Sequence, residues 1–124
     1  MKPITRLALP TLALSLCLLG APAIDASELP MATGEHWSTA TEREKRAYLL
    51  GMGTILEIEH EFQAGDPPEP GTSVVPPLVN GLSDYTLEGL TRNLDQWYAD
   101  NPDGLERPVI EVIWTEFALP NLAP

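Results

Sequence analysis

The sequence predicts an all-α protein, a small bundle of three main helices with a long proline-rich loop after the first. Apolar residues recur at helical spacing in three segments, at about 39–64, 87–99 and 104–118. Five prolines between residues 66 and 77 exclude a helix or a central strand there, so this stretch is expected to be a loop. The short connection at 100–104 makes the second and third helices an antiparallel hairpin.

The first helix, 39–64, follows a flexible entry at 27–37 and ends at Gly65. Ser38, Thr39 or Thr41 can cap it, since a side-chain oxygen there accepts from a free backbone N–H. One face carries a mostly apolar stripe formed by Tyr48, Met52, Ile55, Glu59 and Phe62. Leu49, Leu56 and Ile58 widen this stripe. Gly51 and Gly53 indicate either close contact with another helix or a weak, bent helix.

The second and third helices have shorter apolar stripes. Residues 78–85 are expected to hold a single turn before Thr86, which caps the helix at 87–99. Its stripe is formed by Leu87, Leu90, Leu94 and Trp97. Asp103 and Glu106 resemble a capping box for the helix at 104–118, with Pro108 in its first turn. The β-branched residues of this last segment leave a strand as the alternative.

The N-terminal residues predict export. Lys2 and Arg6 precede an apolar run that is too short to span a bilayer comfortably, and small residues follow it. We expect a signal peptide over residues 1–26, cleaved after Ala26 or alternatively after Ala23, and a periplasmic or secreted product. The remaining chain, 27–124, is a single helical domain without a membrane span, and it loses Cys17, the single cysteine.

The charge excludes two classes of partner. The chain has 18 acidic and seven basic residues, a formal net charge of −11. Such a surface repels nucleic acid and anionic lipid and attracts basic proteins. An alternative is that acidity keeps a small exported protein soluble.

Glu59 is the anomalous member of the first stripe because it places a carboxylate among apolar side chains. A buried carboxylate needs a cationic or hydrogen-bonding partner. Arg92 and Arg107 are the expected partners, in a structural clasp between helices that buries all three polar groups. The alternative is that Glu59 is a catalytic acid.

No complete catalytic or metal-binding constellation is found. Glu57 and His60 form one Glu-x-x-His pair, whereas carboxylate-bridged metal bundles need two such pairs and further glutamates. Neither histidine lies near a nucleophile motif. We therefore expect no catalytic residues, no metal and no cofactor, with a small enzyme using Glu59 or Glu57 as the alternative.

The segment REKRAYLLGMGTILE, a proline-rich middle and the segment from Tyr85 to Pro120 resemble the type VI secretion amidase immunity family. Tyr48 and Gly51 match its Y-x-x-G element, Thr86 a helix start, and Pro102 a helix end. The resemblance implies a periplasmic, often dimeric, all-α protein that binds a cell-wall amidase effector and blocks its active-site cleft.

Two surfaces are candidates for partner binding. The proline-rich loop carries Asp66 and Glu69, which suit a basic amidase cleft, although a plain spacer is the alternative. Trp97 and Tyr98 offer an aromatic surface, or else part of the core or of a homodimer contact. An envelope accessory or ligand-binding module of unknown partner is the alternative function.

Overall fold

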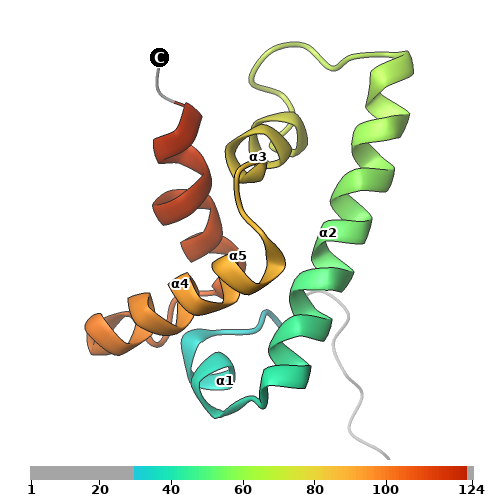
Figure 1. The fold of residues 1–124 in the computed structure, drawn as a ribbon. Helices are drawn as coiled ribbons and strands as arrows, with labels where there is room; N and C mark the ends of the chain where they lie inside the picture. Colours follow the sequence, from blue (N-terminus) through green and yellow to red (C-terminus); the bar gives the residue numbers. More distant parts are fainter. Residues whose placement is uncertain (1–29, 123–124) are drawn as a thin grey trace, which may run out of the picture.

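The computed structural model describes residues 30–122, and over this range the protein is all-α, which confirms the predicted fold class (Figure 1). The α-helices are α1 (Gly34–Thr39), α2 (Glu42–Gly65), α3 (Val75–Leu82), α4 (Leu87–Asp100) and α5 (Val109–Val112). A 3-10 turn, η1 (Pro102–Gly104), precedes α5, and a π-helix, η2 (Ile113–Ala118), and a 3-10 turn, η3 (Leu119–Leu122), continue it. The expected signal peptide and both cleavage sites lie outside the described residues.

The long helix α2 forms one side of the molecule, and of the other elements α3 and α4 pack against it (Figure 1). Its first half contacts α4, and α3 contacts it farther along the chain. On its other side α3 rests on η2 and η3, so α3 lies between the long helix and the C-terminal stretch. Over residues 30–122 no helix is long and apolar enough to cross a membrane.

The core lies where α1, α4 and the C-terminal stretch meet. Leu94, Val109, Val112 and Ile113 are fully buried. The predicted stripe of α4 is correct at Leu90 and Leu94, but Tyr98 is buried in place of Trp97, which is half-buried. Burial of these apolar side chains supplies the main driving force for folding.

From residue 30 on, the entry segment contains a helix, α1, that was not predicted from the sequence. Thr33 forms an isolated antiparallel bridge with Pro108, and the Val109 N–H donates to the Ala32 carbonyl at 2.8 Å. The Trp37 indole N–H donates to the carboxylate of Asp95 at 2.8 Å. These contacts bind α1 to α4 and to the start of α5.

The helix α3 occupies part of the stretch that was expected to be a loop. Pro76 and Pro77 lie in its first turn, where the missing N–H groups have no helical acceptor in any case. The connection after α2 is therefore reduced to residues 66–74.

The last helix begins later than predicted. Residues 102–104 form a 3-10 turn, and α5 begins at Val109, directly after Pro108. A residue before proline is disfavoured in helical conformation, so a helix from 104 cannot pass through Arg107. Helical turns then continue to Leu122, which excludes the strand alternative and extends the element past residue 118.

Close helix contact occurs at a different glycine from those predicted. A Cβ atom on Gly51 or Gly53 would meet nothing within 4 Å, so the prediction of close contact there is wrong. A Cβ on Gly81 would instead collide with the backbone of Ala118. Gly81 thus allows α3 to lie directly against η2.

Candidate functional site

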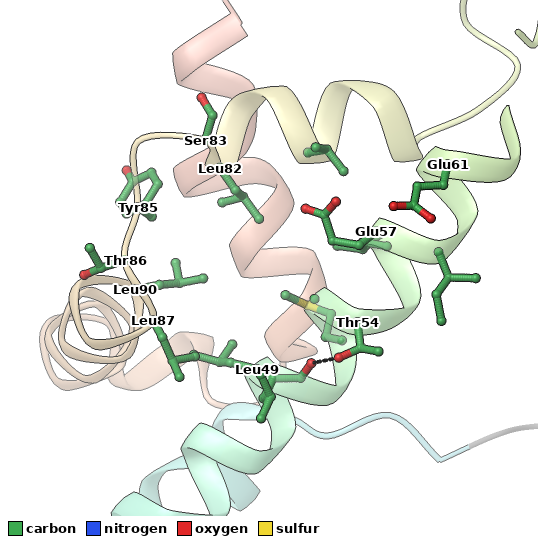
Figure 2. Close-up of a pocket in the computed structure, with 16 residues that line it drawn as sticks. Leu49, Thr54, Glu57, Glu61, Leu82, Ser83, Tyr85, Thr86, Leu87 and Leu90 are labelled. Atoms are coloured by element: carbon green, nitrogen blue, oxygen red, sulfur yellow. Dashed lines mark hydrogen bonds between the residues drawn. The ribbon is translucent and has the colours of Figure 1, made fainter. Parts of the chain in front are cut away.

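A groove of about 690 Å³ opens between α2, α3 and the start of α4 (Figure 2). One wall is the segment of α2 from Leu49 to Glu61, and the other is formed by Val79 and Leu82 of α3. The connection from Ser83 to Thr86 and the first residues of α4 close one end. It is larger than the pocket of about 240 Å³ beside Met31 and Trp114, and it is the best candidate for a site.

The groove exists because α2 is longer than the elements that cover it. The one buried residue of α2 is Leu49, in the first half of the helix. Four of its large apolar residues are 47–77% exposed: Leu50, Ile55, Ile58 and Phe62. The connection at 66–74 leads the chain away from the end of α2 before α3 returns. The second half of α2 is therefore covered only in part.

The groove surface is largely apolar, and the hydroxyls of Thr54 and Thr86 in its lining are hydrogen-bonded. The Thr54 hydroxyl donates to the Leu50 carbonyl at 2.8 Å, and Thr86 accepts from the Gly89 N–H as the cap of α4. Leucine and other apolar side chains provide most of the remaining lining: Leu49, Leu50, Met52, Leu56, Ile58, Val79, Leu82, Leu87 and Leu90. A partner that excludes water from such a surface forms a complex of lower free energy.

Two carboxylates give the groove its charge. Glu57 and Glu61 lie one helical turn apart on α2, and Figure 2 shows both directed toward the space below α3. Among the described residues that line the groove, these are the charged ones, and neither is in an ion pair within residues 30–122. The groove therefore carries uncompensated negative charge along one wall.

The predicted clasp at Glu59 is not formed. Glu59 is exposed, and its carboxylate accepts a hydrogen bond from Gln63 at 2.8 Å on the same helix. The inward face of α2 runs through Leu49 and Leu56, which follow Tyr48 and Ile55 by one residue and so lie about 100° around the helix. This rotation moves Ile55, Glu59 and Phe62 outward, where Glu59 needs no buried partner.

The two expected arginine partners lie elsewhere. Arg92 is exposed on α4, which corrects its placement as a buried group. Arg107 is partly exposed and forms ion pairs with Glu111 at 2.9 Å and Glu116 at 3.2 Å. Its guanidinium also lies over the ring of Trp97, 5.0 Å from the centroid, so Arg107 joins α4 to the C-terminal stretch.

Tyr98 belongs to the core and offers no contact surface, which corrects its prediction as a partner-binding residue. Its side chain is 3% exposed, and its hydroxyl donates to the Arg107 carbonyl at 3.1 Å. Burial raises the pKa of Tyr98 to about 12. Trp97 packs edge-on against it and keeps part of its own surface exposed.

Asp66 and Glu69 are both exposed in the connection after α2, away from the groove lining. The Glu69 carbonyl accepts from the backbone and the hydroxyl of Thr72, and the Ser73 hydroxyl donates to Gln63. The loop is thus tied to α2, and its part in partner binding stays a prediction.

The predicted Glu57 and His60 pair is not brought together with further ligands. His60 is half-buried, and within the described residues its Nδ1 is buried without a hydrogen-bond partner. Residues 30–122 contain no group of three or more His, Cys, Asp or Glu side chains with metal-binding geometry.

Sequence reasoning did not find the groove. It considered Glu57 as part of a Glu-x-x-His pair or as a catalytic residue, and it did not single out Glu61. The apolar segment from Val75 to Leu82, with prolines only near its start, was the available signal for a second wall. No family model, curated protein or solved structure matches this chain.

Proposed function

We propose that this is a non-catalytic binding protein that holds a protein partner in the groove between α2, α3 and α4. The observation that carries the proposal is the groove itself, about 690 Å³ and largely apolar. Outside the groove lining, Ile55 and Phe62 of α2 are also exposed. Large exposed apolar patches on small proteins mark surfaces that bind other molecules.

The place of action proposed is the periplasm or the extracellular space. The support is the N-terminal pattern of two basic residues, a short apolar run and small residues before Ala26. A chain with one cysteine at position 17 would fold there without disulfide bonds.

The specific form proposed is an immunity protein that blocks the active-site cleft of a cell-wall amidase effector. The resemblance at Tyr48, Gly51, Thr86 and Pro102 supports this family, and the net charge of −11 suits a basic effector. In this form the loop with Asp66 and Glu69 would contact the rim of the cleft, and a homodimer would bury further apolar surface.

A second candidate is an envelope accessory protein that binds a small ligand. The groove volume favours it, because pockets for small molecules commonly measure about 300–1,000 Å³. An enzyme using Glu57 or Glu59 is a weaker alternative, since Glu59 faces solvent outside the groove.

Photo-crosslinking in living cells tests the proposal. A photoreactive residue at Val79 would face the groove, and the same residue at its neighbour Asn80, exposed on α3 outside the lining, is the matched control. We expect a protein adduct from position 79 and not from position 80. The captured protein, once purified, should cleave peptidoglycan as an amidase and should lose that activity when this protein is added.

Absence of an adduct at position 79, or equal adducts at both positions, would exclude the groove as the protein-binding site. A captured partner without amidase activity would retain the binding function and reject the immunity assignment.

A further inference from the structure

The two walls of the groove differ in charge. The α2 wall carries the carboxylates of Glu57 and Glu61, whereas the described lining residues of α3, Val79 and Leu82, are uncharged. The cations of the neighbouring surface are engaged elsewhere: Lys45 pairs with Asp95 at 2.8 Å and Arg46 with Glu88 at 3.3 Å. An occupant therefore meets an apolar surface with negative charge along one side.

The secondary structure of the walls restricts the occupant. The walls of the groove are α-helices, and the backbone groups of each helix are hydrogen-bonded within that helix. Residues 30–122 contain no β-strand whose edge could pair with an extended peptide. A peptide in the groove must satisfy its own N–H and carbonyl groups. An amphipathic helix does so and presents an apolar face at the same time.

The spacing of the carboxylates defines where the occupant should carry charge. Glu57 and Glu61 are four residues apart on α2, a rise of about 6 Å along the helix. A helix lying beside α2 would place basic residues at the same interval opposite them. Both carboxylates are exposed, so such pairs contribute mainly to selectivity and to the rate of association.

We infer that the groove binds an amphipathic helix of a partner protein, with its apolar stripe against α3 and α4 and with Lys or Arg residues one turn apart facing Glu57 and Glu61. This inference rests on the proposed function and names the chemical class of the partner segment. It also separates this surface from the proline-rich loop, whose Asp66 and Glu69 lie outside the groove.

A displayed peptide library tests the inference. Each peptide has leucines at helical spacing, and all the remaining positions are varied among Lys, Gln and Glu. The purified protein is the bait, in parallel with the double variant Glu57→Gln/Glu61→Gln and with Glu59→Gln, which removes a carboxylate from the same helix outside the groove.

We expect the unmodified protein and Glu59→Gln to enrich peptides with Lys pairs four residues apart beside the leucine stripe. The double variant should bind the selected peptides about three- to thirtyfold more weakly, as expected for the loss of two exposed ion pairs. The selected peptides should also compete with the crosslink formed at position 79.

Enrichment of Gln or Glu peptides to the same degree, or equal affinity of the double variant, would overturn the inference. Retention of no peptide would overturn it as well. In each case the crosslink at position 79 reports separately whether the groove binds a protein by other chemistry.

Discussion

Tyr98 links α4 to the segment before α5, because its ring is buried on α4 and its hydroxyl donates to the Arg107 carbonyl. The buried neutral form is favoured, which raises its pKa to about 12 from 10.0. Its contribution to the free energy of unfolding is therefore complete below pH 10.0 and is lost as the pH rises toward about 12. We expect Tyr98→Phe to cost about 1 kcal/mol at neutral pH, through the lost hydrogen bond, and to remove part of this alkaline loss.

Urea unfolding of both proteins at about pH 8 and about pH 11 measures the difference. Tyr48, whose pKa is also raised by burial, is present in both and provides the common background. An equal loss of stability in the two proteins would show that Tyr98 does not titrate as a buried group.

Gly81 is the residue that sets the distance between α3 and η2. A Cβ atom there would lie 2.8 Å from the Ala118 Cα and nearer still to its carbonyl oxygen. We expect Gly81→Ala to lower the free energy of unfolding by about 1–3 kcal/mol, as for overpacked cores. The control is Gly51→Ala, whose added Cβ meets open space. This change should raise the free energy of unfolding by up to about 1 kcal/mol, because alanine favours a helix more than glycine does. Equal stability of the two variants in urea would contradict this packing.

The halves of α2 differ in how firmly they are held. The first half carries Leu49 and the ion pair from Lys45 to Asp95, whereas Ile55, Ile58 and Phe62 of the second half are exposed. Few buried contacts imply low local stability. We expect the amides of residues 55–64 to exchange with deuterium faster than those of residues 46–53. Uniform protection along α2, measured by mass spectrometry or NMR, would contradict a loosely held groove wall.

The sequence predicted elements with strong local signals. Thr41 and Thr86 cap α2 and α4, because each accepts a backbone N–H as the pattern indicated. It did not predict α3, because its prolines indicate a loop unless they fall in a first turn, and that depends on where the helix begins. It also misplaced Glu59, because the apolar residues of α2 surround most of the helix and only tertiary packing decides which of them face inward.

The groove results from the unequal lengths of α2 and of the helices that pack against it. The 24 residues of α2 extend beyond the cover that α3 and α4 provide, and the remaining surface is apolar with negative charge at Glu57 and Glu61. No sequence motif marks Glu57 and Glu61 together as residues of a groove. The candidate site is formed by segments of three helices that only the tertiary structure brings together.

We propose that this protein acts by contact through that groove, which a deuterium-exchange footprint of its complex with the partner captured at position 79 can test. Partner binding should slow exchange at residues 52–61 of α2 and at residues 79–87 of α3 and the start of α4. Slower exchange confined to the 66–74 loop or to the region around Trp97, with the groove unchanged, would contradict it.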